Sequence, residues 1–329
     1  MFRHTPLRLA ALALIAAGAI FQVLTADYFG LDITVEIAVL ALVVIALDMV
    51  AGFGGMVSLC HGALMGLGAY SYAALSVIFE VEPALAMAGA VAISGAAAWL
   101  IGAICARAHG IYFIMATLAF GQMAYSFVFE SATLGGDDGV SGVPRLDLSA
   151  FGIDLMDSRT FALAACILAA VAYAFAAMVL RSGLGRSLSG VMHNEKRMRA
   201  LGLNVWRVKA DVFGLSGLIT GLAGAVAAQH VMFVSPTVMS WTVSGEALVV
   251  VILGGLGTLV GPVLGAAAFV VLKHEISSLT EHWHMIVGLI LIAVVVSGAN
   301  GIFGVMEALA RRLARSRAAT AGRVSSSAR

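Results

Sequence analysis

The sequence predicts an all-α membrane protein, a polytopic bundle of about ten transmembrane helices. Hydrophobic residues make up 61% of the 329 residues, charged residues make up 11%, and the mean hydropathy is +1.01. A soluble domain carries about 25% charged residues, so a single water-soluble core cannot hold this many apolar side chains. The apolar runs are continuous rather than alternating, which favours helices over a closed barrel.

Ten apolar segments are close to the roughly 20 residues that a membrane-spanning helix needs. They lie at residues 7–25, 34–51, 57–79, 84–105, 111–129, 160–180, 209–232, 243–260, 263–280 and 284–305. The first resembles a signal peptide because Arg3 and Arg8 flank its start, but no small-x-small cleavage site stands before Asp27. We therefore expect a retained helix.

The distribution of charge predicts the topology. Lys and Arg concentrate at the N-terminus, in segment 181–209 and in the tail 311–329, and the positive-inside rule places all three in the cytoplasm. Six predicted spans precede segment 181–209 and four follow it, so both termini share its side. We expect a transmembrane domain over residues 1–310, with a cytoplasmic loop at 181–209, an acidic extracytoplasmic loop at 130–159, and a disordered basic tail at 311–329. The basic clusters adjoin apolar helices without interleaved aromatics, which indicates anionic lipid rather than nucleic acid as a partner.

The sequence predicts neither an enzyme nor a metal protein. It contains no GxxxxGK phosphate loop, no GxSxG elbow, no HExxH pair and no CxxC pair. Cys60, Cys105 and Cys166 are isolated in apolar runs, where packing is their expected role. We expect no bound cofactor in this chain, and any nucleotide that supplies energy must bind to another subunit.

Glycine punctuates two apolar stretches, AGFGGMVSLCHGALMGLGAY at 51–70 and LGGLGTLVGPVLGA at 253–266. Each Gly costs a helix about 1 kcal/mol relative to Ala, so this density indicates broken or closely packed helices. Paired breaks in two halves are typical of an inverted-repeat carrier with its pathway between the halves. Close packing through small residues accounts for the same glycines, and both interpretations stay open. The candidate pathway residues are Asp48, Ser58, His61, Gly62, Gly66, Thr117, Gln122, Glu246, Gly254 and Gly255.

Charges inside apolar spans are functional candidates because they are costly in lipid. Asp48 and Glu246 could be ion sites of a secondary carrier driven by an ion gradient, and for Asp48 structural hydrogen bonding is an equal alternative. Lys273 and Glu275 lie near a membrane end, where we expect them to snorkel. A structural membrane scaffold without transport is a further alternative.

Segment 181–209 has the mixture of apolar and basic residues that a partner's groove could bind. Short helices are predicted at Leu184–Val191 and at His193–Leu201, the second ended by Gly202. Met192 and Met198 would be apolar contacts within a basic surface. The alternative is a solvated basic loop that only fixes the orientation of the chain.

Four stretches together resemble the LivM-type permease subunits of bacterial branched-chain amino acid ABC importers. They are ALDMVAGFGGMVSLCHGALMGLGAY, ARAHGIYFIMATLAFGQM with GGDDGVSGVP, RSGLGRSLSGVMHNEKRMRALGLNVWRVK, and GEALVVVILGGLGTLVGPVLGA. The resemblance implies that the central segment docks on an ATP-hydrolysing subunit. Its implied coupling residues are Leu184, Met192, Asn194, Glu195, Arg197, Arg199, Ala200, Leu201 and Gly202.

The chain departs from the pattern of these proteins at several positions. Lys196 and Arg197 replace the two alanines of the importers' Glu-Ala-Ala motif, and the glycine comes one residue late. Cys60 stands where glycine is common and Asp48 where asparagine is usual. These departures bear on the docking surface and on the pathway.

The resemblance also implies a complex in the bacterial inner membrane. Its other members would be a LivH-like second permease, LivG-like and LivF-like subunits that bind ATP and Mg, and an extracytoplasmic substrate-binding protein. This chain would form half of a translocation pathway for branched-chain amino acids. Similar permeases serve urea, other amides and aromatic acids, so these substrates are alternatives.

Overall fold

The structure is a bundle of helices with one short two-stranded ribbon. This computed structural model describes residues 6–147, 152, 154–280, 282, 285–289, 292 and 301–307. The helices are α1 (Pro6–Thr25), α2 (Tyr28–Ala51), α3 (His61–Ala73), α4 (Pro83–Cys105), α5 (Ile111–Phe129), α6 (Ser158–Arg181), α7 (Gly183–His193), α8 (Glu195–Ala200), α9 (Val205–Val231), α10 (Trp241–Gly254) and α11 (Val260–Leu279). The strands are β1 (Val140–Ser141) and β2 (Phe233–Val234), and short helical turns lie at Ala74–Ile78, Ala132–Leu134, Gly136–Asp138 and Pro236–Met239.

The predicted helical membrane architecture is confirmed. Among the described residues six helices are long and apolar enough to cross a membrane, namely α2, α4, α5, α6, α9 and α11. Helices α1, α3 and α10 fall within further predicted spans but have shorter apolar helical stretches. Half of the predicted span 284–305 lies outside the described residues, and the predicted tail 311–329 lies wholly outside them.

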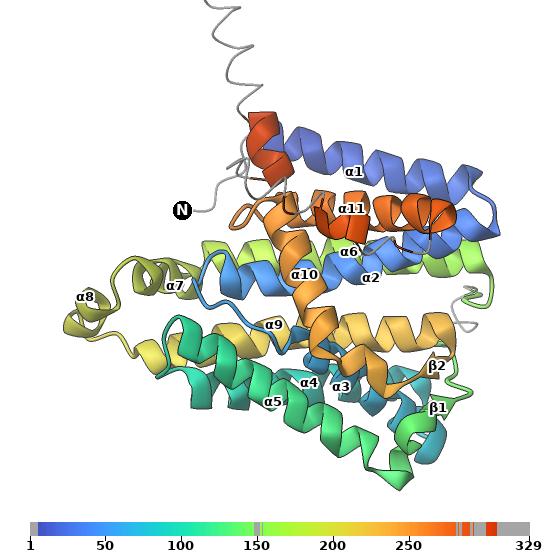
Figure 1. Ribbon diagram of the computed structural model, residues 1–329, viewed down its shortest axis with the longest axis horizontal. Helices are drawn as coiled ribbons and strands as arrows, with labels where there is room; N and C mark the ends of the chain where they lie inside the picture. The colour runs from blue at the N-terminus through green and yellow to red at the C-terminus, as the bar shows by residue number, and fades with distance from the viewer. Residues whose placement is uncertain are drawn as a thin grey trace, which may run out of the picture.

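The long helices run side by side, with α7 and α8 at one end of the bundle and β1 and β2 at the other (Figure 1). Segments 181–209 and 130–159, which the charge pattern assigns to opposite sides of a membrane, therefore lie at opposite ends. The ribbon joins the segment before α6 to the segment after α9, because Val140 pairs with Val234 and Ser141 with Phe233. We call these ends the α7–α8 end and the ribbon end.

Helices α2 and α9 form the centre of the bundle. Most of the apolar window of each is buried, 78% in α2 and 72% in α9, whereas only 22% is buried in α5. From Ile37 to Leu47 helix α2 carries only apolar residues on every side, as a helix enclosed by its neighbours does. Helix α9 approaches its neighbours closely through glycines: a Cβ on Gly224 would overlap the carbonyl oxygen of Met65 in α3.

Both glycine-rich stretches break helices. Residues 52–60 are not helical, so α3 begins at His61, four residues after the start of the predicted span 57–79. Gly55 has a φ of +66°, a conformation that glycine adopts without steric cost. In the second stretch α10 ends at Gly254, and Gly255 and Gly257 also have positive φ before α11 begins. The prediction of interrupted helices is confirmed, and the predicted start of the third span is corrected.

Candidate functional site

Segment 181–209 folds into two short helices whose ends are set by side-chain caps. The hydroxyl of Ser182 accepts from the backbone N–H of Leu184 at 3.2 Å, which starts α7. The side chain of Asn194 accepts from the N–H of Arg197 at 2.9 Å, which starts α8, and Gly202 with φ +82° follows its end. The two predicted helices are found, but the second starts at Glu195 rather than at His193 because Asn194 is its cap.

Helix α7 is held on the bundle by its apolar face. Leu188 is fully buried, and Val191 is nearly so. Met192 stays 48% exposed although its side chain adjoins Gly55. Met198 was expected to face a partner, and this prediction is corrected: its side chain fills the space beside Gly190, where a Cβ would lie 2.6 Å from Met198 Cε, and so packs α8 on α7.

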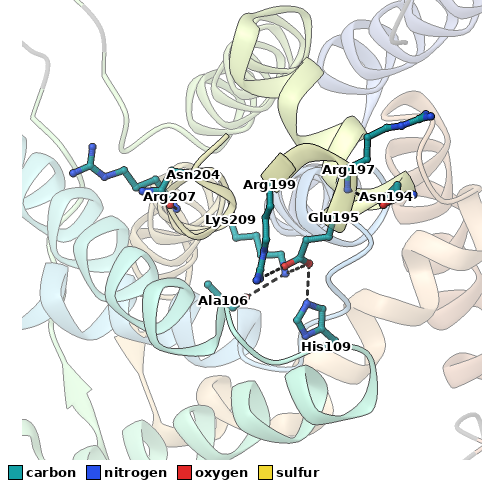
Figure 2. A network of polar contacts seen from close by, with 9 residues as sticks. All are labelled: Ala106, His109, Asn194, Glu195, Arg197, Arg199, Asn204, Arg207 and Lys209. Atoms are coloured by element: carbon teal, nitrogen blue, oxygen red, sulfur yellow. Dashed lines mark hydrogen bonds and ion pairs between the residues drawn. The ribbon is translucent and has the colours of Figure 1, made fainter. Parts of the chain in front are cut away.

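Glu195 ties α8 to two other parts of the bundle (Figure 2). Its carboxylate accepts a hydrogen bond from Lys209 Nζ in α9 at 2.9 Å, and His109 Nε2, in the α4–α5 turn, lies 2.8 Å away. It also pairs with the guanidinium of Arg199 within α8. Lys209, which is only 5% exposed, donates in addition to the carbonyl of Ala106 at 3.2 Å. We call Glu195, Lys209, His109 and Arg199 the Glu195 cluster.

The Glu195 cluster keeps its carboxylate ionised. Partial burial by itself would raise the pKa of Glu195, but the hydrogen bonds from Lys209 and His109, with the Lys209 charge, lower this pKa to about 2. Glu195 is therefore engaged inside the chain at neutral pH. Its contacts are those of an anchor for α8 rather than of a free carboxylate on the surface.

The predicted coupling residues divide into an exposed and an inward set. Met192, Asn194, Arg197, Ala200, Leu201 and Gly202 are exposed, and Leu201 is 71% exposed. Arg197 points away from the Glu195 cluster, toward the outside of the bundle (Figure 2). Glu195 and Arg199 belong to the cluster, although the Arg199 side chain is itself more than half exposed, and Leu184 in the first turn of α7 is partly buried. The charge pattern counts Lys209 as one base of segment 181–209 and places His109 in a separate inside turn before residue 111, and it does not pair either with Glu195.

Asp48 joins the two glycine-rich stretches. Its Oδ1 accepts from the backbone N–H of Gly257 at 2.6 Å, and its Oδ2 accepts from the N–H of Leu259 at 2.9 Å. The side chain is fully buried, and a Cβ on neighbouring Gly52 would lie 2.5 Å from the nitrogen of Gly257. Of the two interpretations left open for Asp48, the hydrogen bonds support the structural one.

Four other predicted pathway residues gather around the start of α3. Ser58 and His61 are fully buried, with His61 Nδ1 3.2 Å from Ser58 Oγ and His61 Nε2 3.4 Å from Ser216 Oγ. Thr117 in α5 accepts from the N–H of Leu59 at 3.2 Å. The N–H of Gly62 donates to Ser244 Oγ in α10 at 2.8 Å. Ser216 and Ser244 were not predicted, since isolated serines in apolar helices carry no sequence signal.

The remaining pathway candidates differ in their environment. Gln122 in α5 and Glu246 in α10 are exposed on the outside of this chain. Gly66 packs against Met239, and Gly254 against the backbone of Gly261, so both serve close packing; Gly255, with φ +118°, forms the turn after α10. Lys273, expected to snorkel, instead pairs with Glu36 of α2 at 2.7 Å. Over the described ranges, no group of three or more His, Cys, Asp or Glu is placed to hold a metal ion.

Comparison with known proteins identifies the family. The model of the branched-chain amino acid transport system / permease component family matches residues 30–296. This chain belongs to that family. It is 28% identical over 299 residues to the high-affinity branched-chain amino acid transport system permease protein LivM of Escherichia coli K12, covering 82% of this chain and 69% of that protein.

Two other relatives are matched over nearly the whole of their own length. The ribose import permease protein RbsC of Escherichia coli K12 is 27% identical over 299 residues, 87% of this chain and 91% of RbsC. The permease protein LivH of Escherichia coli K12 is 24% identical over 284 residues, 80% of this chain and 91% of LivH. No solved structure matches the chain significantly. The chain is thus a multi-pass membrane permease, as its resemblance to LivM-type subunits predicted.

Proposed function

We propose that this chain is a permease subunit of an ATP-driven importer of branched-chain or related amino acids, docked on an ATPase through α7 and α8. The observation that carries the proposal is the outer face of these two helices. It presents the exposed apolar side chains Met192 and Leu201 beside the exposed bases Arg186, Lys196 and Arg197. Amphipathic helices of this kind bind in grooves of partner proteins, and the sequence has no phosphate loop of its own.

The caps and the Glu195 cluster support the proposal that this face transmits force from a partner to the bundle. A six-residue helix is unstable in isolation, yet α8 is fixed by Asn194 at its start and by Lys209 and His109 at its side. A rigid, attached helix can transmit force from a partner, whereas a solvated loop cannot. The ATPase partner, with ATP and Mg bound there, would then supply differential binding energy to two positions of α7 and α8.

We propose that the exposed polar residues of α5 and α10 line this chain's half of a translocation pathway. Gln122 and Glu246 face outward from apolar helices, where lipid contact would be costly. A second permease that covers this face would place both residues beside a shared passage. Because the chain resembles both LivM and LivH, which are permease proteins of one transport system in Escherichia coli, we propose a LivH-like partner.

The remaining parts of the proposal concern the two ends of the bundle. The ribbon end carries the exposed acids Glu130, Asp137 and Asp138, which suit a binding protein that delivers substrate outside the cell. The basic α7–α8 end and both termini would face the cytoplasm of a bacterial inner membrane. Leucine, isoleucine and valine are the proposed substrates, with urea, amides and aromatic acids as the alternatives within the family.

The ion-gradient carrier has less support than the importer. Both carboxylate oxygens of Asp48 accept backbone hydrogen bonds in a fully buried position, and Glu246 lies apart on the outer face. Uptake that stops when ATP is depleted, and continues when the proton gradient is collapsed, would separate the two mechanisms. Competition of leucine uptake by valine, urea and phenylalanine would rank the substrates.

The docking proposal is tested by reversing the exposed charges. In the complete complex, Lys196→Glu with Arg197→Glu should reduce ATPase co-purification and leucine uptake at least about tenfold, the cost of about 1.4 kcal/mol in docking. Arg159→Glu, at an exposed arginine in the first turn of α6 and so far from the α7–α8 end, is the matched control and should change neither. Normal assembly and uptake in the double variant would refute the docking surface.

A further inference from the structure

An extended segment at residues 54–60 connects α2 to α3 and runs back into the bundle (Figure 1). Alternate side chains face inward, since Met56, Ser58 and Cys60 are buried while Val57 and Leu59 are less so. Non-helical backbone at membrane depth occurs where it is enclosed by protein or lines a cavity. The contacts of its two ends indicate the role of this segment.

The first end touches α7, the larger of the two proposed docking helices. A Cβ on Gly54 would lie 3.2 Å from Leu188 Cδ1, and a Cβ on Gly55 would lie 3.1 Å from Met192 Cγ. Leu188 also shares one buried apolar cluster with Met56 and Cys60. Any displacement of α7 toward or away from the bundle therefore acts directly on the segment, because packed interiors do not absorb such shifts.

The second end, together with the first turn of α3 that continues it, is bound to the two helices that carry the exposed polar residues. The N–H of Leu59 donates to Thr117 Oγ1 in α5, and the N–H of Gly62 donates to Ser244 Oγ in α10. Both hydroxyl-bearing side chains are buried, so water does not replace these bonds. Thr117 and Ser244 lie on the inner faces of the helices whose outer faces present Gln122 and Glu246.

We propose that segment 54–60 transmits the position of α7 to α5 and α10, and that Thr117 and Ser244 are positioning residues which couple ATP hydrolysis to transport. This inference rests on the proposed function. The segment lacks the repeated i to i+4 bonds of a helix, so its path is set by its attachments. These are apolar packing on α7 at one end and, at the other, the hydroxyl of Thr117 on Leu59 and the hydroxyl of Ser244 on Gly62 in the adjoining first turn of α3. The position of the segment therefore responds both to α7 on the docking face and to the pathway helices α5 and α10.

The first test removes the two hydroxyl groups in the complete transporter. Thr117→Val with Ser244→Ala should lower leucine transported per ATP hydrolysed at least fivefold, with assembly and basal ATP hydrolysis retained. Thr220→Val and Ser94→Ala are matched controls. Thr220 bonds only its own helix, and Ser94 bonds the carbonyl of Leu64 farther along α3. An unchanged ratio in the double variant, or an equal fall in the controls, would overturn the proposal.

The second test uses the native complex, so that it does not depend on the variant folding. Amide hydrogen exchange is compared between the nucleotide-free complex and a complex held with ATP by a hydrolysis-deficient ATPase. Exchange over residues 54–62 should change together with exchange over α7. A change in α7 with no change in segment 54–62 would contradict the transmission role while leaving the docking proposal intact; absence of ATPase binding would instead refute the docking proposal.

Discussion

Replacing Glu195 by Gln tests whether the Glu195 cluster anchors α8. The substitution keeps the size of the side chain and one oxygen acceptor but removes the charge that faces Lys209, His109 and Arg199. Lys209 would then keep only the carbonyl of Ala106 and a neutral amide as partners. We expect α8 to separate from α9 and from the α4–α5 turn in part of the molecules.

The contacts set the size of this effect. His109 and Arg199 have side chains that are more than half exposed, and exposed pairs contribute about 0–1 kcal/mol each. Lys209 is buried, and its bond to a carboxylate is worth about 1.5–3 kcal/mol. The sum, about 1.5–5 kcal/mol, corresponds to a factor of roughly 10 to 4,000 in the attached population at about 1.4 kcal/mol per tenfold change.

A double-mutant cycle separates charge pairing from simple loss of structure. ATPase affinity is measured by titration of the purified permease pair, and thermal unfolding is followed in the same detergent. Glu195→Gln should weaken the affinity at least tenfold. Adding Lys209→Met should restore part of this loss, because a neutral pair leaves no uncompensated buried charge. Unchanged affinity in Glu195→Gln, or additive losses in the double variant, would refute the anchoring role.

Three further predictions concern stability and pH. Asp48→Ala should lower the free energy of unfolding by about 3–6 kcal/mol, because two buried N–H groups lose a charged acceptor at about 1.5–3 kcal/mol each; Asp48→Asn should cost less, and equal melting temperatures for all three proteins would contradict this. Gly224→Ala should cost about 1–3 kcal/mol through overlap with Met65. Gly18→Ala in α1, with no atom within 4 Å of its Cβ, should instead stabilise the protein by up to about 1 kcal/mol in the same thermal assay. The pKa of Glu195 is lowered from 4.5 to about 2, so its stabilising contribution is fully present about one unit above pH 4.5 and is lost as pH falls toward 2. The difference in melting temperature between native protein and Glu195→Gln should therefore be constant from about pH 5.5 to 8 and should shrink at lower pH.

The helical spans were predictable because the bilayer requires long apolar segments whatever their packing. The break before α3 was predictable from Gly52, Gly54 and Gly55, but its end was not. Val57 and Leu59 are as apolar as helix residues, so hydropathy extended the span through them. What makes this stretch extended is its packing against α7 and its bonds to Thr117 and Ser244, which only the tertiary structure brings together.

The role of Asp48 illustrates what sequence reasoning cannot supply. Its partners are backbone N–H groups 209 and 211 residues away, and backbone donors leave no mark on the identity of a residue. The partners of Glu195, unlike those of Asp48, are side chains that the sequence does show. Lys209 and His109 were visible as charges, but counting them for topology treats them as independent, whereas the fold places both within 3 Å of one carboxylate.

The attachments of α7 and α8 converge on α5. The Glu195 cluster holds α8 to His109, two residues before α5 begins, and the extended segment connects α7 to Thr117 inside α5. These two points are eight residues apart, roughly 12 Å along a helix, so force applied at α7 and α8 reaches α5 at two places and would shift the helix as a rigid body. Helix α5 has the smallest buried share among the six long membrane helices, which makes it the one least restrained by its own chain. We therefore expect the largest movement between transport states in α5, and a spin label at exposed Met123 should report it, with a label at exposed Ile167 of α6 as the reference that stays in place.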